Sequence, residues 1–426
     1  MLETLEFPLI PVLAQMEITG VKFDKVVLNE VSEILKEKLE KVEDELFDLA
    51  GERINLKSAK QVSQLLSKII DPVTAKKTKT GQVSTSESIL IDLAPGNRIA
   101  ELLLRVRKLG KIISTYTESL PQYINKKTGR IHPDFKQTTT ATGRLSCADP
   151  NLQNLPIIYE EGREVRRTLV PESNRLVIVA ADYSQIELRL LAALSKDSTL
   201  IFAFKNNKDI HNITAAKVFG IKETEVTKDL RAKAKMVNYG IPYGLSAFGL
   251  SQNLKIKMAE ASQIIENYFS EFDSIKNYTK EHLNYAREKE YTETLLGRRR
   301  YIRDINSKNG TVRKNAERIA INAPLQGLAA DIIKLAMIKI DKAFRMEKLK
   351  SKMILQVHDE LVFEVYKPEL EKAISIIKKY MEKPIDLGIP LEVNIGVGEN
   401  WLDLKKTALK ERKKSSKKKR LKKLNS

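Results

Sequence analysis

Two apolar segments that lie far apart in the sequence each end in acidic residues. The first, at 176–187, contains Asp182 near its end, and the second, at 353–363, contains Asp359. A buried strand that ends in a carboxylate is costly unless the charge meets a cation. If the two strands lie side by side, Asp182 and Asp359 could hold two magnesium ions roughly 3.5–4 Å apart, the arrangement for in-line phosphoryl transfer. The alternative is that each acid merely begins a surface turn.

A stretch between the two acidic segments carries cations and aromatic residues at a helical spacing. Arg231, Lys235, Tyr239 and Tyr243 are each four positions apart, so they would share one slowly drifting face of a helix. Arg and Lys suit phosphate groups, whereas an aromatic ring suits a sugar and a base, so their order matches the groups of a nucleoside triphosphate. An ordinary basic helix with its aromatic end in the core explains the same spacing equally well.

Together with further motifs, these segments resemble the A family of DNA polymerases, in the polymerase region of bacterial DNA polymerase I. The family's three main motifs are similar to 182–187, 231–244 and 357–360. Further similarities lie at 140–146 (TATGRLS), 149–154 (DPNLQN), 209–211 (DIH) and 321–327 (INAPLQG). The likeness runs from about Phe7 to Trp401, with the motifs in the family's order and spacing.

The resemblance implies an α+β fold of the right-hand polymerase type, with an antiparallel-sheet palm, helical fingers and a helical thumb. It divides the chain into a palm-associated N-terminal segment (1–24), the thumb (25–130), a first palm part (131–204), the fingers (205–330), a second palm part (331–404) and a basic tail (405–426).

Local patterns in the sequence predict several elements directly. The apolar spacing in 29–50 indicates an amphipathic helix, 172–191 indicates a strand followed by a helix, and 353–366 is typical of a hairpin with His358, Asp359 and Glu360 at its tip. A further helix is expected to begin at 331, and the stretch 76–85, which is rich in Lys, Thr and Ser, predicts an exposed loop.

The net charge of the 426-residue chain is +19, and it is unevenly distributed. Residues 405–426 contain 12 Lys or Arg and one Glu, so this tail supplies +11 and the rest of the chain supplies +8. A segment with so much charge is expected to be disordered or a frayed helix, and it could either contact DNA or serve solubility. The moderately basic body suits a polyanion, although many proteins of this charge bind no nucleic acid.

Other features of composition exclude several classes of protein. The single Cys147 rules out an intramolecular disulfide framework, and four His residues make a structural zinc site improbable. No apolar run approaches the roughly 18 residues of a membrane span, and the N-terminus has no secretion signal. We therefore expect a cytoplasmic monomer of bacterial or phage type with no membrane partner, with an organelle as the alternative location.

The resemblance implies that a primer 3′-hydroxyl on primer–template DNA attacks the α-phosphorus of a dNTP and that pyrophosphate leaves. It makes Asp182 and Asp359 the ligands that bridge two Mg²⁺ ions, which Mn²⁺ could replace, with Tyr183 as a further metal-binding residue. Glu360 is assigned a supporting catalytic role, and Lys235 could protonate the leaving group. No proofreading or 5′ nuclease domain is expected in this chain, because those domains lie upstream of this region in the family.

The family also implies a set of residues around the dNTP. Arg231, Lys235 and His211 would hold the triphosphate, and the remaining members of the set are Gln185, Glu187, Tyr239 and Tyr243. Glu187 would exclude a 2′-hydroxyl. Tyr239 stands where most members of the family have Phe, so we predict weak discrimination against dideoxynucleotides. Pro242 is a second departure, which we expect to kink the fingers helix and shift Tyr243.

The DNA-binding residues implied by the family are Arg144, Arg318, Asn322, Gln326 and His358. Arg144 and Gln326 would reach the minor groove at the primer end, where every Watson–Crick pair presents purine N3 and pyrimidine O2 acceptors. His358 would lie beside the primer terminus. Asn322 could equally be an amide that packs between helices.

Two other functions remain open from the sequence. One is a DNA-binding relative without catalytic activity, against which the retained Asp182, Asp359, Arg231 and Lys235 argue. The other is an RNA polymerase of the A family, like those of phages and mitochondria, against which Glu187 and the region of Gln326 argue.

Overall fold

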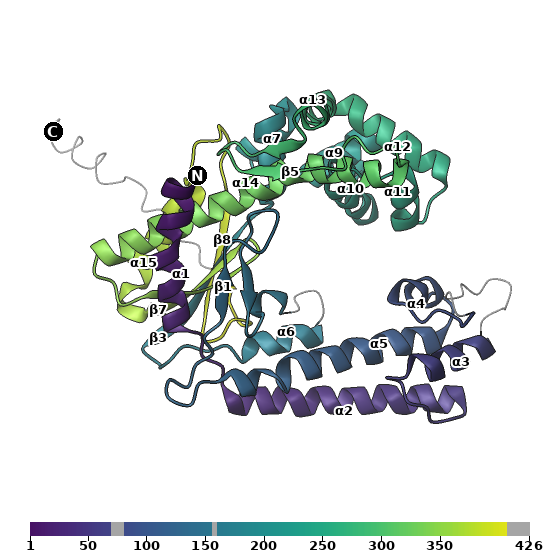
Figure 1. Cartoon of the computed structure of the whole chain (residues 1–426), viewed down its shortest axis with the longest axis horizontal. Coiled ribbons are helices and arrows are strands. Elements are labelled where there is room, and N and C mark those ends of the chain that lie inside the picture. Colours follow the sequence, from purple (N-terminus) through teal and green to yellow (C-terminus); the bar gives the residue numbers. More distant parts are fainter. Residues whose placement is uncertain (70–80, 156–159, 407–426) are drawn as a thin grey trace, which may run out of the picture.

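A five-stranded antiparallel sheet forms the base from which two helical arms extend (Figure 1). The computed structural model describes residues 1–69, 81–155 and 160–406. The strands are β3 (Leu176–Tyr183), β6 (Lys352–Val357), β7 (Glu360–Tyr366), β8 (Val393–Gly398) and β9 (Lys405–Lys406), in the order β6–β7–β3–β8–β9. Because β3 has a strand on either side and is buried along most of its length, its run of Val, Ile and Ala suits its central place.

Four helices either pack against the sheet or lead from it into the upper arm. They are α1 (Phe7–Thr19), which follows the π-helical turn Leu2–Glu6, α7 (Ile186–Ser195), α14 (Gly310–Met346) and α15 (Leu370–Glu382), which follows the 3₁₀ turn Lys367–Glu369. The 37-residue α14 is long and apolar enough to cross a membrane, but 78% of its most apolar stretch is buried inside the protein. Its apolar character is therefore explained by its position as a core helix.

The lower arm in Figure 1 is built on two long helices that lie side by side. It contains α2 (Lys25–Ala50), α3 (Ala59–Ile69), α4 (Glu87–Leu93) and α5 (Arg98–Ile112), continued by the short turns Ile113–Thr117 and Leu120–Tyr123, with α6 (Glu160–Arg167) beside them. The carboxylate of Asp24 caps α2 by accepting from Val26 N at 2.8 Å, and Gly51 ends it at φ +70°. The amphipathic helix predicted for 29–50 is confirmed and begins four residues earlier, at Lys25.

The upper arm is mainly helical, as predicted for this part of the chain. It contains α8 (Ser198–Lys205), α9 (Ile210–Phe219), α10 (Lys228–Gly240), α11 (Ala247–Leu254), α12 (Met258–Glu271) and α13 (Asp273–Lys289), the turns Glu223–Glu225 and Ile241–Tyr243, and a hairpin of β4 (Tyr291–Glu293) and β5 (Arg299–Tyr301). A second small hairpin, β1 (Asp134–Lys136) with β2 (Ser146–Ala148), lies next to the turn Leu152–Asn154. One continuous apolar core joins both arms to the sheet.

Three expectations about the boundaries of elements need correction. The helix expected to begin at 331 begins at Gly310, so the boundary drawn at 330/331 falls inside α14, which continues through Pro324. Pro242 does not kink a helix, because α10 ends at Gly240 and Pro242 lies in the following 3₁₀ turn with Tyr243. Lys405 and Lys406 pair with β8 as a strand and so do not begin a disordered tail.

Two other expectations concern parts of the chain that the structure covers only partly. The remainder of the predicted tail, 407–426, lies outside the described residues. The same is true of 76–80 in the predicted loop. At its described end, Val83 is buried and its carbonyl accepts from the Ser63 hydroxyl at 2.8 Å, so this part of the loop packs against α3.

Candidate active site

Strand β3 and the β6–β7 hairpin bring the two predicted aspartates together where these strands end, at one end of the sheet that we call the acidic edge. Asp182 is paired in register with Glu360, the first residue of β7, and Asp359 precedes Glu360 in the turn. The backbone N–H of Tyr183 donates to the carbonyl of Asp359 at 3.2 Å. The two acidic segments are therefore direct neighbours, joined through their main chains.

The local environment raises the pKa of both aspartates. The pKa of Asp182 rises to about 7, first because surrounding protein displaces solvent, and then through the negative charges of Glu360 and Asp359. The side chain of Asp182 is nevertheless exposed, so we attribute its raised pKa chiefly to repulsion from Glu360 and Asp359. Burial also raises the pKa of Asp359, which the positive charge of Arg144 partly offsets. This edge of the sheet therefore carries an excess of negative charge that favours a bound cation.

Glu360 faces Asp182 but is held by partners of its own. One of its oxygens accepts from the indole N–H of Trp401 at 3.0 Å, and the other accepts from Arg166 at 3.5 Å. The guanidinium of Arg166 in turn lies 3.9 Å from the centre of the Trp401 ring. Since both oxygens have partners within the protein, this arrangement suits the supporting role expected for Glu360.

Tyr183 can contribute to a metal site only through its main chain. Its side chain is buried, and its hydroxyl donates to the carbonyl of Met381 at 2.7 Å. No three His, Cys, Asp or Glu side chains converge as a preformed metal site in the described ranges. Mg²⁺ is usually held by one or two carboxylates together with substrate phosphates and water. Asp182 and Asp359 therefore fit an ion whose coordination is completed by a phosphorylated substrate.

His211 lies buried between α9 and α10 as a hydrogen-bonded core residue. The Thr214 hydroxyl donates to Oδ1 of Asn238 at 3.0 Å, which orients the amide so that Nδ2 donates to Nδ1 of His211 at 3.0 Å. Neutral His211 therefore carries its proton on Nε2, which lies 3.3 Å from the amide nitrogen of Gln185. Two donors cannot bond to each other, so the Gln185 amide is expected to turn its oxygen toward His211.

Burial, reinforced by the positive charges of Arg231 and Lys235, lowers the pKa of His211 to about 4, although Asp209 opposes the shift. His211 is thus a neutral donor at pH 7. Asp209 caps α9 and accepts from Nε of Arg231 at 2.8 Å, which fixes Arg231 beside the start of that helix. Lys235 is exposed one turn farther along α10, and it forms no ion pair within the part of the chain that the structure describes.

The aromatic end of α10 and the turn after it approach the acidic edge. The pKa of Tyr239 is raised by burial and then by the negative charges of Glu187 and Asp359. Glu187 on α7 accepts from Arg144 at 3.0 Å. The Tyr243 hydroxyl is buried next to Glu187, but no hydrogen bond of normal geometry to it is found among the described residues. Tyr239 and Glu187 therefore lie near Asp359, with Tyr243 beside Glu187.

Three of the DNA-binding candidates lie along α14. Arg318 is exposed and donates to Asn315 at 3.4 Å, whereas Asn322 and Gln326 are partly buried. Oδ1 of Asn322 is a buried acceptor without a partner among the described residues. His358 is exposed at the hairpin tip at φ +52°, and its carbonyl accepts from the Gln356 side chain at 2.6 Å.

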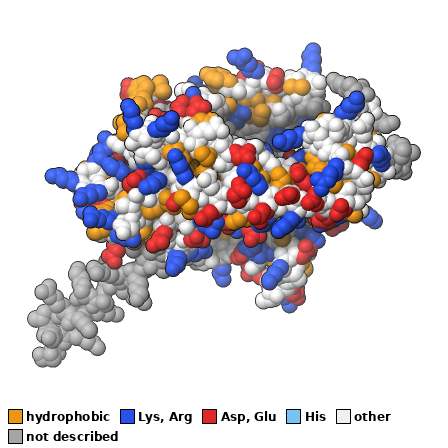
Figure 2. Space-filling view, turned by 90° about the horizontal axis from the view of Figure 1, so that it is seen from below, with side chains coloured by type: hydrophobic (Ala, Val, Ile, Leu, Met, Phe, Trp, Pro, Cys, Tyr) orange, Lys and Arg blue, Asp and Glu red, His pale blue; other side chains and the backbone are white. Residues whose placement is uncertain are grey.

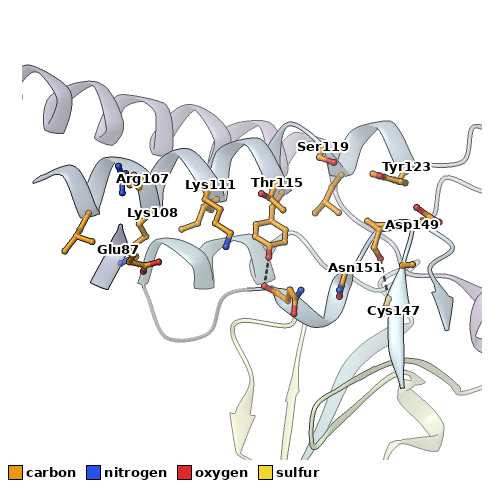
Figure 3. Close-up of a pocket in the computed structure, with 17 residues that line it drawn as sticks. Glu87, Arg107, Lys108, Lys111, Thr115, Ser119, Tyr123, Cys147, Asp149 and Asn151 are labelled. Atoms are coloured by element: carbon orange, nitrogen blue, oxygen red, sulfur yellow. Dashed lines mark hydrogen bonds between the residues drawn. The ribbon is translucent and has the colours of Figure 1, made fainter. Parts of the chain in front are cut away.

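A cleft of about 980 Å³ separates α5 from the segment that follows β2 (Figure 3). Arg107, Lys108 and Lys111 line it from α5, and Asp149 and Asn151 line it from the other side. Arg107 donates to the Thr85 carbonyl, and Lys108 pairs with Glu161 at 3.3 Å. The cleft therefore combines cationic side chains from one arm with polar groups next to the sheet.

The side of the lower arm that carries α2 has a different character. Figure 2 shows Lys and Arg interspersed with Asp and Glu on this face. The exposed ion pairs Arg53–Asp44 at 2.8 Å and Arg98–Glu45 at 2.7 Å each use an acid of α2. Mixed charge of this kind gives no field of a single sign, and each exposed pair contributes little to stability.

Four residues with roles in this arrangement were missed by the sequence analysis. Arg166 and Trp401 support Glu360, Asn238 sets the tautomer of His211, and Asp209 positions Arg231. Only Asp209 and Asn238 lay inside quoted motifs, at 209–211 and 231–244. No spacing signal marks Arg166 and Trp401, which are far apart in the chain and meet only in the fold.

Comparison with known proteins is consistent with this geometry. The DNA polymerase family A model matches residues 25–403. DNA polymerase I of Caldicellulosiruptor bescii is 46% identical over 95% of this chain and 47% of its own length, and that of Thermus thermophilus is 45% identical over 94% and 48%. A polymerase domain from M. smegmatis, solved in complex with DNA primer-template and dNTP, aligns with a TM-score of 0.88 and 40% identity over 94% of this chain and 70% of that one.

The chain spans about half the length of the curated relatives it matches. The fold predicted from the resemblance, an α+β right hand with an antiparallel-sheet palm, helical fingers and a helical thumb, is confirmed by the structural likeness. Because the family model covers most of the sequence, the chain belongs to DNA polymerase family A.

Proposed function

We propose that this chain catalyses template-directed DNA synthesis, adding dNTPs to a primer 3′-hydroxyl with release of pyrophosphate. The observation that carries the proposal is the meeting of two groups of residues from distant parts of the sequence. Asp182 and Asp359 lie together at one end of the palm sheet. Tyr239 lies near them, since the negative charge of Asp359 contributes to its raised pKa. The same helix carries Arg231 and Lys235. Catalysis of phosphoryl transfer is mainly positioning and charge neutralisation, which such a site supplies.

Divalent metal ions, which polymerases of this family use, would be held by the carboxylates of Asp182 and Asp359 and the main-chain carbonyl of Tyr183. We assign two Mg²⁺ ions to them. When bound, such ions lower the pKa of the attacking hydroxyl and neutralise charge on the triphosphate and the leaving group. The mutual repulsion of the carboxylates, seen in the raised pKa of Asp182, supports this assignment because bound cations relieve it.

The nucleotide would bind against α10. Arg231, which Asp209 fixes, and Lys235, which has no ion pair among the described residues, would hold the phosphates, and Lys235 would protonate the departing pyrophosphate. Neutral His211 donates from Nε2, and Gln185 lies at the same point. Glu187, which accepts from Arg144 and has Tyr243 beside it, would exclude a ribose 2′-hydroxyl.

The product duplex would lie along the cleft between thumb and palm. Lys111, Arg107 and Lys108 would meet its phosphates, while Arg144 and Gln326 reach the minor groove at the primer terminus and Arg318, Asn322 and His358 contribute nearby. The buried acceptor of Asn322, which has no partner in 1–69, 81–155 or 160–406, supports a role at an interface, since buried acceptors normally have partners. We further propose an intracellular monomer, in keeping with bacterial relatives.

Primer extension tests this proposal. The purified chain is given a primed template, Mg²⁺ and either dNTPs or rNTPs, and Asp182→Ala serves as the control. We expect extension with dNTPs alone and none from the control. Extension that needs no Mg²⁺, or that survives in Asp182→Ala, would overturn the proposal, and equal use of rNTPs would favour an RNA polymerase.

A further inference from the structure

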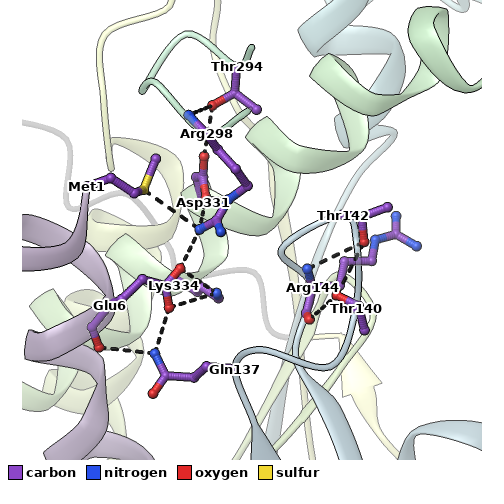
Figure 4. A network of polar contacts seen from close by, with 10 residues as sticks. All are labelled: Met1, Glu6, Gln137, Thr140, Thr142, Arg144, Thr294, Arg298, Asp331 and Lys334. Atoms are coloured by element: carbon purple, nitrogen blue, oxygen red, sulfur yellow. Dashed lines mark hydrogen bonds and ion pairs between the residues drawn. The ribbon is translucent and has the colours of Figure 1, made fainter. Parts of the chain in front are cut away.

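A buried cluster of four charged residues lies beside the loop that carries Arg144 (Figure 4). It consists of Glu6 from the N-terminal turn, Arg298 next to β5, and Asp331 and Lys334 from α14. Asp331 and Lys334 are fully buried, and the side chains of Glu6 and Arg298 are 13% and 18% exposed. Two acids and two bases balance, so the cluster brings no net charge into the interior.

Arg298 links the members of the cluster. Its Nε donates to Oδ1 of Asp331 at 2.7 Å, and its Nη2 pairs with Asp331 and with Glu6. Nζ of Lys334 donates to both oxygens of Glu6, at 2.9 and 3.1 Å. The Gln137 amide also donates to Glu6, at 2.6 Å. The planar guanidinium presents its donors in a fixed fork, which spans two carboxylates here. The ammonium of a lysine lacks this fixed geometry.

The same guanidinium lies against the loop at 140–146. Gly143 has φ +80°, and a Cβ on it would fall 2.4 Å from Nε of Arg298 and 2.6 Å from its Cζ. On α14, a Cβ on Gly327 would fall 2.6 Å from Cγ2 of Thr294, whose hydroxyl bonds Asp331 at 3.1 Å. Glycine is therefore required at both contacts, and each adjoins a proposed minor-groove residue, Arg144 or Gln326.

Stability alone does not explain such a cluster. Buried ion pairs can often be replaced by apolar residues without loss of stability, because desolvation of the charges offsets their attraction. The contacts of this cluster also join the elements that carry its members. They connect the N-terminal turn, the hairpin of the fingers and α14. Gly143, which precedes Arg144 in the sequence, and Gly327, which follows Gln326, pack against this set.

We propose that this cluster positions Arg144 and Gln326, and that Arg298 is the positioning residue which sets their reach to the minor groove at the primer terminus. The inference rests on the proposed polymerase function and deepens it. Residues that touch no substrate would then control how strictly the polymerase checks the terminal base pair.

Single-turnover extension of two primers tests the inference, one ending in guanine and one in 3-deazaguanine, which lacks the N3 acceptor. In the unaltered protein, loss of N3 is expected to slow extension by about tenfold, the effect of about one hydrogen bond. Arg298→Lys keeps the charge and loses the fork. We expect it to slow extension of the guanine primer by about tenfold and to show little further loss with 3-deazaguanine, the non-additivity of coupled groups. Arg345→Lys, at an exposed ion pair with Asp341, is the matched control and should behave as the unaltered protein.

A second variant guards against loss of the fold. Glu6→Gln with Lys334→Met removes one charge of each sign, and its control is Glu347→Gln with Lys372→Met, at an exposed pair 2.6 Å apart. It should give the same non-additive result as Arg298→Lys. Full sensitivity to N3 in either folded cluster variant would overturn the inference, as would equal rates on both primers in the unaltered protein. Absence of all extension by the unaltered protein would instead overturn the proposed function.

Discussion

The acidic edge of the palm and the buried cluster beside the loop of Arg144 use charge in opposite ways. At the edge, Asp182, Asp359 and Glu360 lie close together, Arg166 pairs with Glu360, and the charge of Arg144 partly offsets that of Asp359. In the cluster, Glu6 and Asp331 are matched by Arg298 and Lys334. The edge is open to solvent and carries surplus negative charge, whereas the cluster is closed and neutral. An excess of like charge at a protein surface indicates a missing partner, while a balanced buried set indicates a structural role.

The largest expected effect separates the two regions by activity. Asp182→Ala or Asp359→Ala should lower the rate of primer extension by about 10³ or more. Each variant removes a ligand of the metal ions, which stabilise the charge that develops in the transition state by several kcal/mol. Neither should destabilise the fold, because each removes a repelling charge. The comparison would break if either variant unfolded at a much lower temperature than the unaltered protein in the absence of metal.

The next effect separates them by stability. Glu6→Ala should lower the free energy of unfolding by about 3–5 kcal/mol, because it leaves the fully buried Lys334 without the acceptors it has in the structure. Denaturation by urea measures this value. Asp44→Ala, which removes the half-exposed partner of the exposed Arg53, should have a much smaller effect. Equal losses of unfolding free energy in the two variants would show that the buried cluster contributes no more to stability than an exposed ion pair.

These two regions also differ in how far the sequence predicted them. Strand β3, the β6–β7 hairpin and the adjacency of Asp182 and Asp359 followed from local apolar patterns and the motif resemblance. The cluster was not predicted, because Glu6 and Lys334 are 328 residues apart and no local spacing links them. The start of α14 was misplaced because a helix was predicted only from 331, where the family's boundary between fingers and palm was drawn, whereas the helix runs without a break from Gly310 to Met346.

A third prediction concerns pH and metal. The folded protein holds Asp182 at a pKa raised to about 7 from a usual value near 3.8, so it favours the protonated acid. This contribution to stability is complete below about pH 4 and is lost as the pH rises to 7, because the unfolded chain releases the proton first. Metal-free melting curves should fall more steeply over this range in the unaltered protein than in Asp182→Asn. Mg²⁺ should restore stability at pH 7 only in the unaltered protein, and parallel curves would contradict the account.

The smallest effect concerns Tyr239, which belongs to neither region but lies near Asp359 and Glu187. Tyr239→Phe removes a hydroxyl that could replace the missing 3′-hydroxyl contact of a dideoxynucleotide. We expect the preference for dNTP over ddNTP to rise by about tenfold, the worth of one hydrogen bond. Extension with mixed dNTP and ddNTP measures the ratio, and an unchanged ratio would remove Tyr239 from this role.

The most direct test of the shared metal site is a count of bound ions. Electron paramagnetic resonance can count Mn²⁺ bound to the protein with a dideoxy-terminated primer on a template and the matching dNTP. The account predicts two ions per chain in the unaltered protein and in the control Glu347→Gln, and fewer in both Asp182→Ala and Asp359→Ala. Retention of both ions by either aspartate variant would contradict it.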